Sequence, residues 1–280
     1  MLVPFSKILI PIDFSERCLG AARFSIPLAE RFHSEITLLH VEAPPEAYPD
    51  RDLEREVPPE KRLRDFLCAA FAHLDVKRIL RVGPDVAHEI VQYAREYGSD
   101  LIMMPTHGYG AFRRFLLGST TAKVLYDTSC PVWTGAHLAQ GPPAEWINPT
   151  TVVCAADNDA GSEKALEWAS RMASALDADL VLLHVEPRFV LRSEDYDSQE
   201  FHEQVIAEAN QKMDNLQVSA GTRAKVVIRG GIVPHEVSKV AEDLDADLLV
   251  IGRRSDPASE GLGLNTYGII RESPCPVVSV

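Results

Sequence analysis

Several features that would place this chain in other classes of protein are missing from its sequence. It has only five cysteines among 280 residues, and none of them forms a C-x-x-C pair, which argues against a disulfide framework or a structural zinc site. No apolar run approaches the roughly 18 residues of a membrane-spanning helix. The first residues lack the basic start, apolar stretch and cleavage site of a signal peptide. We therefore expect a cytoplasmic protein whose reduced cysteines serve as small apolar side chains.

Basic residues are also few compared with acidic ones. The chain has 28 Lys and Arg against 41 Asp and Glu, a formal net charge of −13. A surface of this sign repels the phosphates of nucleic acids and anionic membranes, so we expect neither as a partner and expect any phosphate ligand to be held locally. With 46% hydrophobic and 25% charged residues, the composition is that of a packed globular protein long enough for two domains.

The second half of the chain repeats the first. The segments ITLLHVE and LVLLHVE match, and a Gly-Pro-Pro linker separates the two copies. We predict one domain over residues 1–138 and a second over 149–280. Equivalent residues recur at a nearly constant spacing: Asp13 with Asp157, His40 with His184, His88-Glu89 with His235-Glu236, and Cys130-Pro131 with Cys275-Pro276.

Within each copy, short apolar runs alternate with longer amphipathic stretches, which predicts an α/β fold with a parallel sheet. The runs are apolar throughout, as expected for strands covered by helices on both faces. We therefore predict two tandem Rossmann-like domains, each with a five-stranded parallel sheet. In the first copy the expected strands are 7–12, 35–41, 76–82, 100–105 and 130–135, and the expected helices are 16–33 after an N-cap at Ser15, 60–74, 84–97 with Pro84 in its first turn, and 118–127.

Residues suited to binding follow the predicted strand ends, where open parallel sheets bind their ligands. Asp13 ends the first strand, and His40 and Val41 end the second. The loop after the fourth strand leads to Gly118, where backbone N–H groups and the positive end of a helix dipole would favour a phosphate. Gly108 would let the backbone approach the ligand, and His107 with Arg113 or Arg114 would add charge. The alternative is that Gly118 only starts a helix that Ser119 caps.

These segments, IPIDFSE, LLHV and the glycine-containing loop, resemble the universal stress protein family over nearly the whole chain, as two copies. The resemblance implies an adenine nucleotide alpha hydrolase-like fold. The family's ATP-binding signature is G-x-x-G, nine residues, then G-S or G-T. Gly108, nine residues and Gly118-Ser119 match its longer part, whereas Pro105 stands at the first glycine and supplies no N–H.

The resemblance implies a nucleotide pocket in the first copy. The ligand would be ATP, with AMP or ADP as alternatives, and Mg²⁺ would be carried by its phosphates. The implied contacts are Pro11, Ile12 and Asp13 near the adenosine, the backbone of Val41 at the adenine edge, and Met104, His107, Gly108, Gly118, Ser119, Thr120 and Thr121 on the ribose and phosphate side. Asp13 has an alternative role as a cap for the next turn through Ser15 or Arg17.

The second copy departs further from the signature. Ser255 replaces the second glycine, only seven residues separate it from Gly263, and Leu264 replaces the phosphate-side serine. We therefore expect the anion-binding features to be lost there. Neither histidine pair has H-E-x-x-H spacing, so we expect a shared role in the fold for the histidines, ahead of catalysis or metal binding.

Two functions remain open on the sequence. The first is a stress-response protein that binds ATP as a regulatory ligand, with no recognisable catalytic residue and at most slow ATP hydrolysis. The second is an interaction scaffold that never binds nucleotide, which Pro105 and the altered second copy favour. The S-G-G-x-D-S loop of adenylating enzymes and the G-x-G-x-x-G of dehydrogenases are absent after the first strand.

The last strands of the two copies would be edge strands, and we expect them to pair as an intramolecular pseudo-dimer, with a homodimer as a further level of assembly.

Overall fold

The computed structural model describes residues 5–44, 57–106, 117–135, 148–157, 160–187, 199–253 and 263–280. Its contacts divide the chain into two compact units, one over Phe5–Ala144 and one within Glu145–Val280. We refer to these units as the first and second halves. Each half has the same sequence of strands and helices, so each is described by itself.

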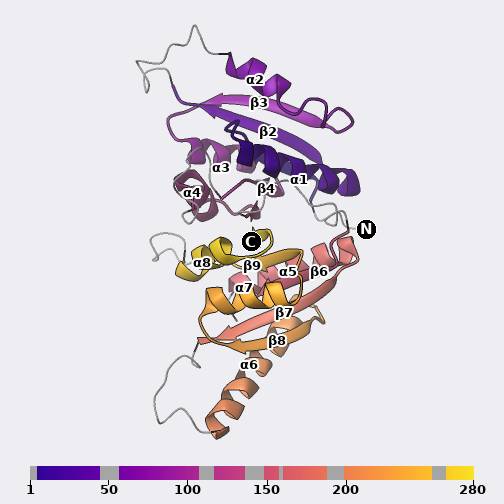
Figure 1. Ribbon diagram of the computed structural model, residues 1–280, viewed down its shortest axis with the longest axis vertical. Helices are drawn as coiled ribbons and strands as arrows, with labels where there is room; N and C mark the ends of the chain where they lie inside the picture. Colours follow the sequence, from indigo (N-terminus) through magenta and orange to yellow (C-terminus); the bar gives the residue numbers. More distant parts are fainter. Residues whose placement is uncertain are drawn as a thin grey trace. The chain divides into compact units, whose positions relative to one another are not determined.

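The first half has a parallel sheet with strand order β3-β2-β1-β4-β5 (Figure 1). The order reverses beside β1, which places the switch point between β1 and β4. Its elements are β1 (Lys7–Pro11), α1 (Glu16–Phe32), β2 (Glu35–Glu42), α2 (Pro59–Asp65), β3 (Val76–Val82), α3 (Val86–Tyr97), β4 (Leu101–Met103), α4 (Ser119–Asp127) and β5 (Val132–Thr134).

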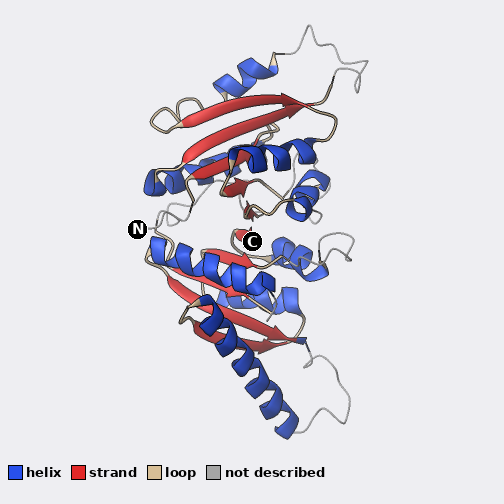
Figure 2. Cartoon of the chain, turned by 180° about the vertical axis from the view of Figure 1, so that it is seen from behind, coloured by secondary structure: helices blue, strands red, loops and turns tan. Residues whose placement is uncertain are grey.

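The second half has the same topology, with strand order β10-β9-β6-β7-β8. Helices α7 and α8 pack together on one face of this sheet, and α5 and α6 pack together on the other (Figures 1 and 2). The predicted fold class is therefore confirmed. The elements are β6 (Thr151–Ala155), α5 (Ala160–Leu176), β7 (Asp179–Glu186), α6 (Gln199–Ala220), β8 (Lys225–Gly230), α7 (Val233–Asp243), β9 (Leu248–Ile251), α8 (Leu264–Glu272) and β10 (Val277–Ser279).

The central strands are buried on both faces, which explains their unbroken apolar sequences. Ile8, Leu9 and Ile10 on β1 are at most 1% exposed, as expected where helices cover both sides of a sheet. Helix α1 begins as predicted, because the Ser15 hydroxyl accepts a hydrogen bond from the N–H of Cys18 at 3.2 Å.

Three local expectations were wrong. The helix expected over 60–74 ends at Asp65, because Phe66 is extended and Leu67 has a φ of 46°; the turns that follow bury Phe66 and Phe71. Helix α3 begins at Val86, so Pro84 precedes it, and Asp85 caps it by accepting from the N–H of His88. Cys68 is exposed and is not an apolar core residue.

An aspartate fixes the start of the central strand in each half. Asp100 Oδ2 accepts hydrogen bonds from the N–H of Ser6 at 2.7 Å, its hydroxyl at 2.8 Å and the N–H of Lys7 at 3.0 Å. Asp247 does the same for Thr150 and Thr151. Both aspartates immediately precede the strand beside β1 or β6, so each ties two neighbouring strands together.

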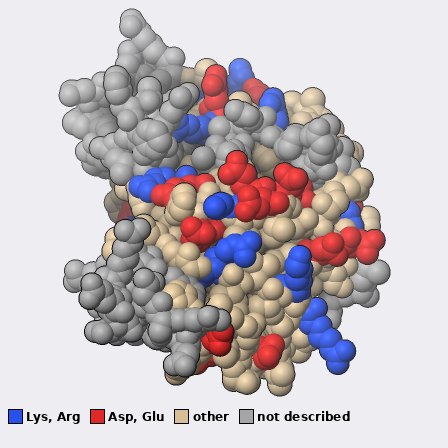
Figure 3. All heavy atoms as spheres, turned by 60° about the horizontal axis from the view of Figure 1, so that its bottom comes forward, with Lys and Arg blue, Asp and Glu red and all other residues tan. Residues whose placement is uncertain are grey.

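The charge of the surface and the apolar character of the helices indicate which kinds of partner the protein can have. On the face drawn in Figure 3, basic and acidic side chains are interspersed. Within the described ranges, no helix combines the length and apolar character needed to cross a membrane.

Candidate functional site

The predicted binding residues of the first half meet at the C-terminal edge of its sheet. Pro11 ends β1, Val41 lies near the end of the neighbouring β2, and Met104 follows β4 on the other side of β1. The N–H of Ile12 still donates to Leu39 O on β2 at 2.8 Å. Ile12 and Met104 are each 4% exposed and Val41 9%. These three side chains therefore form a floor with little open surface.

Asp13 lies beyond this floor and is partly exposed. Its Oδ1 atom accepts from both the N–H of Ser15 at 2.9 Å and the Ser15 hydroxyl at 2.6 Å. The predicted structural role through Ser15 is thus confirmed. Among the described residues no group donates to Oδ2 of Asp13, so this oxygen can still accept a hydrogen bond from a ligand.

Helix α4 starts at the same edge, and among the described residues its first backbone N–H groups have no acceptor. Its N-cap is Gly118, with no side-chain cap, so the alternative in which Ser119 caps the helix was wrong. The first bond within the helix joins the N–H of Ala122 to Gly118 O at 2.8 Å. The N–H groups of Ser119, Thr120 and Thr121 therefore precede the helical ladder, which is the usual arrangement at an anion-binding helix start.

Two groups of the predicted phosphate site are occupied by the protein itself. The Thr121 hydroxyl, which is buried, donates to the carbonyl of Pro105 at 3.0 Å. The N–H of Gly118 donates to Thr106 O at 2.8 Å. Of the residues predicted on this side, His107 and Gly108 lie outside the described residues, as do Arg113 and Arg114. Among the described residues of the predicted site, the remaining donors are the hydroxyls of Ser119 and Thr120 and the three N–H groups.

Of the two repeated histidine pairs, His40 and His184 have the same structural role in both halves, as predicted. His40 Nδ1 donates to Ile12 O at 2.6 Å, and its Nε2 lies 3.0 Å from Glu42 Oε2. His184 Nδ1 lies 3.0 Å from Ala156 O. Each ring thus ties the end of the second strand in its half to the chain leaving the first strand. Among the described residues, no cluster of three or more His, Cys, Asp and Glu side chains could hold a metal ion.

The second half has a pocket of about 360 Å³ at the equivalent edge. It lies between Asp157, after β6, and the start of α8 at Gly263 and Leu264. Asp157 is the one charged side chain among the described residues that line it. Leu264, at the position of Ser119, is 91% exposed. Leu264 therefore replaces the Ser119 hydroxyl at the start of the helix, and no described residue that lines the pocket is positively charged.

Gly252 brings two segments into contact beside this pocket. A Cβ atom at Gly252 would lie 2.6 Å from the carbonyl carbon of Gly161 and 2.7 Å from its oxygen. The start of α5 can approach the end of β9 only because residue 252 has no side chain. Pro105 holds the corresponding position in the first half.

Comparison with known proteins agrees with this architecture. The model of the universal stress protein family matches residues 4–134 and again 149–280. The chain belongs to the universal stress protein family. A universal stress protein of Methanocaldococcus jannaschii is 30% identical over 141 residues, which cover 46% of this chain and 80% of that protein.

Solved universal stress proteins show the same fold. The structure of one from Archaeoglobus fulgidus has a TM-score of 0.70 and 21% identity, and the match covers 100% of this chain and 97% of that one. Another was solved in complex with cAMP; it has a TM-score of 0.38 and 20% identity and matches 47% of this chain and 97% of its own length.

Sequence reasoning missed a cluster around Phe14, next to Asp13. Phe14 has a φ of 62°, which is uncommon for a bulky residue. Its ring centroid lies 4.5 Å from that of His40, and the Arg62 guanidinium lies 4.1 Å above it. Phe66 packs against it edge-on, with centroids 6.0 Å apart. The cluster links α2 to the site, and a backbone angle of this kind leaves no signal in the sequence.

Three of the cysteines, Cys18, Cys154 and Cys275, are buried and chemically inert. Burial, with a smaller contribution from Asp13, raises the pKa of the Cys18 thiol to about 12. Burial likewise raises the pKa of Cys154 and of Cys275 to about 12. Because the thiolate is the reactive form, none of these three thiols is available as a nucleophile at neutral pH.

Proposed function

We propose that the first half binds ATP, or alternatively AMP or ADP, as a regulatory ligand in a cytoplasmic stress response. The observation that supports this most directly is the start of α4, where the N–H groups of Ser119, Thr120 and Thr121 are free of the helical ladder. Oriented N–H groups at a helix start stabilise an anion through hydrogen bonds and the helix dipole. The phosphates would lie there, with Mg²⁺ carried between them.

The adenosine would lie along the strand ends. Asp13 Oδ2 can accept from a ribose hydroxyl while Oδ1 continues to hold Ser15. The buried floor of Ile12, Val41 and Met104 would pack against the base. The base would thus lie on the apolar strand ends, and the anionic phosphates would lie at the N–H groups that start α4.

The side chains near this edge favour binding without turnover. His40 is engaged with Ile12 O and Glu42, and the Cys18 thiol is protonated at neutral pH because its pKa is about 12. Neither group is a ready base or nucleophile. Slow hydrolysis by a water molecule is the most activity that we propose.

We expect the first half to bind ATP and the second half not to bind it. In the second half, the apolar Leu264 stands at the position of Ser119, where a phosphate chain would lie. The Leu264 side chain offers no hydrogen bond to a phosphate, whereas the Ser119 hydroxyl does. We therefore assign one ATP to each chain.

Isothermal titration of ATP tests this assignment. The wild-type protein should bind one equivalent, and Gly118→Asp should abolish binding because a carboxylate at the helix start repels the phosphates. Gly263→Asp, the matched change in the second half, should leave the stoichiometry and affinity unchanged. No heat from the wild type up to about millimolar ATP, an affinity of about −4 kcal/mol, would exclude the proposal.

The alternative is a scaffold that binds no nucleotide. The bonds from Thr121 to Pro105 and from Gly118 to Thr106 favour it, because they use two donors that would otherwise face a phosphate. Native mass spectrometry of the gently purified protein separates the two functions. Co-purifying ATP or AMP, absent from Gly118→Asp, contradicts the scaffold.

The two tandem domains also suit an intramolecular pseudo-dimer, in which the last strands of the halves would pair. The support is that β5 ends the strand order of the first half and β10 that of the second, and exposed strand edges tend to be covered. Deleting residues from Cys275 onward should give an aggregating product. A soluble monomeric truncation would contradict the pairing, and sedimentation of the full chain would show whether two chains associate further.

A further inference from the structure

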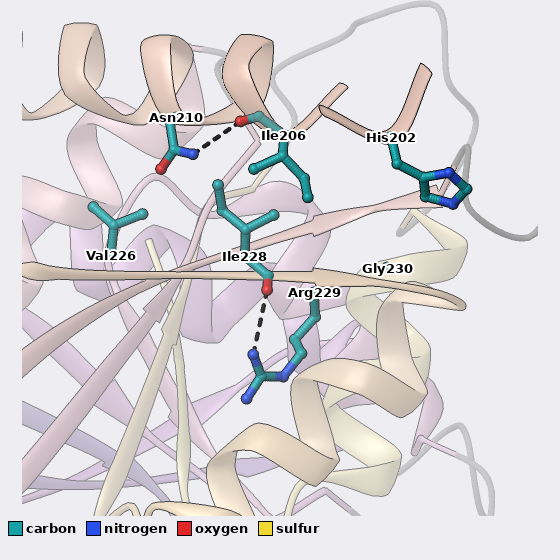
Figure 4. A pocket seen from close by; sticks show the side chains of 7 residues that line it. All are labelled: His202, Ile206, Asn210, Val226, Ile228, Arg229 and Gly230. Carbon is teal, nitrogen blue, oxygen red and sulfur yellow. Dashed lines mark hydrogen bonds between the residues drawn. The ribbon is translucent and has the colours of Figure 1, made fainter. Parts of the chain in front are cut away.

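A groove of about 500 Å³ lies between α6 and β8 in the second half, away from the pocket described above. Figure 4 shows its two walls: Val226 and Ile228 point from β8 toward α6, while the Arg229 side chain lies on the other side of the strand. On α6, Ile206 is 43% exposed, and its carbonyl is bonded to the Asn210 amide at 2.9 Å. One side of the groove is therefore apolar.

The groove runs along the outer edge of a strand. β8 pairs with β7 and ends the strand order of its half. The N–H of Gly231 donates to Glu186 O on β7. Because the direction of the backbone groups alternates along a strand, the N–H and C=O groups of Val226, Ile228 and Gly230 point away from β7. The Arg229 guanidinium donates to one of these carbonyls, that of Ile228, at 3.3 Å.

The first half closes the corresponding edge with its own side chains. Arg78, at the position of Val226, reaches the carbonyl of Leu63 on α2 at 3.2 Å. Arg81, at the position of Arg229, pairs with Glu89 at 3.4 Å and with Glu96. Arg78 is therefore bonded to α2 and Arg81 to α3, so neither side chain is available to a partner.

The cations of β8 have no such partners. Lys225 and Arg229 are exposed, and among the described residues neither forms an ion pair with a carboxylate. In the first half, Lys77, the counterpart of Lys225, pairs with Glu35 at 2.5 Å. The second half thus has a strand edge that no described strand pairs with, with an apolar face and a basic face, on a chain whose net charge is −13.

We propose that this edge binds an extended acidic peptide segment of a partner protein, which adds to the sheet as a strand beside β8. Side chains alternate between the faces of a strand. Residues of the peptide that face α6 would meet Ile206 and Ile228, and alternate residues would meet Lys225 and Arg229. The groove therefore selects a segment in which apolar and acidic residues alternate. A second copy of this chain fits less well, because two chains of net charge −13 repel each other.

Binding would exchange one hydrogen bond for another. The Arg229 guanidinium leaves Ile228 O and pairs with a peptide carboxylate, while a peptide N–H donates to the carbonyl that Arg229 has left. Backbone bonds would supply the affinity and the alternating side chains the specificity, as in other cases of strand addition.

Hydrogen exchange of the full-length protein tests this directly. The probe is a capped peptide in which glutamate and valine alternate. It should slow exchange of the N–H groups of Val226, Ile228 and Gly230, whereas those of Val227 and Arg229, which point toward β7, should change little. Arg229→Glu should weaken binding by about tenfold or more because it replaces attraction with repulsion, and Arg171→Glu, a matched change on the exposed side of α5, should have little effect.

Two further peptides separate strand addition from simple charge attraction. One has the same composition with its glutamates and valines in separate blocks, and the other is N-methylated on alternate amides so that it cannot pair with a strand. Both should bind at least about tenfold more weakly. Equal binding of either peptide, or no protection of the three edge amides, overturns the proposal. Edge protection that rises with protein concentration in the absence of peptide would assign the edge to a second copy and also overturn it.

Discussion

The Thr121 hydroxyl donates a hydrogen bond to the carbonyl of Pro105 across 3.0 Å, in the buried space between β4 and α4. This bond joins the residue that departs from the family's ATP-binding signature to the helix proposed to hold the phosphates. The altered loop is thus stabilised by a partner from α4. Thr121 would then contribute its backbone N–H to the proposed phosphate site, while its side chain stabilises the fold.

Removing this hydroxyl should reduce stability. Thr121→Val leaves the buried carbonyl of Pro105 without its donor, and we expect a loss of about 1–3 kcal/mol in the free energy of unfolding, measured in urea. Thr120→Val, the neighbouring and more exposed change, should cost less. Equal costs for the two variants would show that the bond to Pro105 contributes nothing.

Asp13 should separate a structural effect from a ligand effect. Asp13→Ala removes the acceptor for both Ser15 groups and should cost about 1–3 kcal/mol of stability. Asp13→Asn keeps an acceptor oxygen, so it should preserve most of the stability while weakening ATP binding through the lost charge at Oδ2. Denaturation and calorimetric titration of both variants measure this; an Asn variant with wild-type ATP affinity would remove Asp13 from the binding site.

Gly252 should tolerate no side chain. The Cβ of Gly252→Ala would meet the Gly161 backbone at 2.6 Å, so we expect a loss of about 1–3 kcal/mol from overpacking. Gly263→Ala is the control, because its Cβ would have Thr266 Oγ1 as its nearest neighbour at 3.8 Å. A small, equal effect of both changes on thermal unfolding would contradict the close approach of α5 to β9.

The buried thiols predict an alkaline loss of stability. The pKa of Cys154 is raised from 9.0 to about 12, so the folded state retains its proton while the unfolded state loses it above pH 9. Stability from this group is therefore complete below pH 9 and falls as the pH rises toward 12, by up to about 1.4 kcal/mol per pH unit. Cys154→Ala should lack this component, so the difference in stability between wild type and variant should shift with pH above 9.

The same burial predicts which thiols react in the native protein. Cys68 is exposed and should be modified first by a thiol reagent near pH 8. Cys18, Cys154 and Cys275 should react only after unfolding, because they are buried and protonated. Mass mapping of the modified cysteines tests this order.

The sequence predicted the repeated parallel sheet because its strands are buried on both faces and carry unbroken apolar runs. It predicted the N-cap at Ser15 for a similar reason, since a serine before an amphipathic stretch has a specific hydrogen-bonding role. It failed over residues 66–74, where helix-forming residues leave the helix so that Phe66 and Phe71 can reach the core. Tertiary burial there outweighs local preference.

The candidate site was predictable in position but not in detail. The spacing of Asp13, Val41 and Gly118 located the edge of the sheet, because parallel strands end at a common edge. The bond from Thr121 to Pro105 and the positive φ of Phe14 depend on how distant segments meet. Nor did the sequence reveal the outer edge of β8, with which no described strand pairs; its exposed cation became evident only when Arg229 was compared with the paired Arg81.

The bonds that Asp100 makes to Ser6 and Lys7 join residues more than ninety positions apart. During synthesis, the hydrogen bonds at the start of the first strand cannot form until Asp100 and most of the first half have been made. In the second half, the bond to Thr150 likewise cannot form until Asp247 has been made. Each half should consequently gain its stability late and all at once. A fragment cut just before either aspartate would expose apolar strands that have lost their anchor, and cellular proteases would remove it.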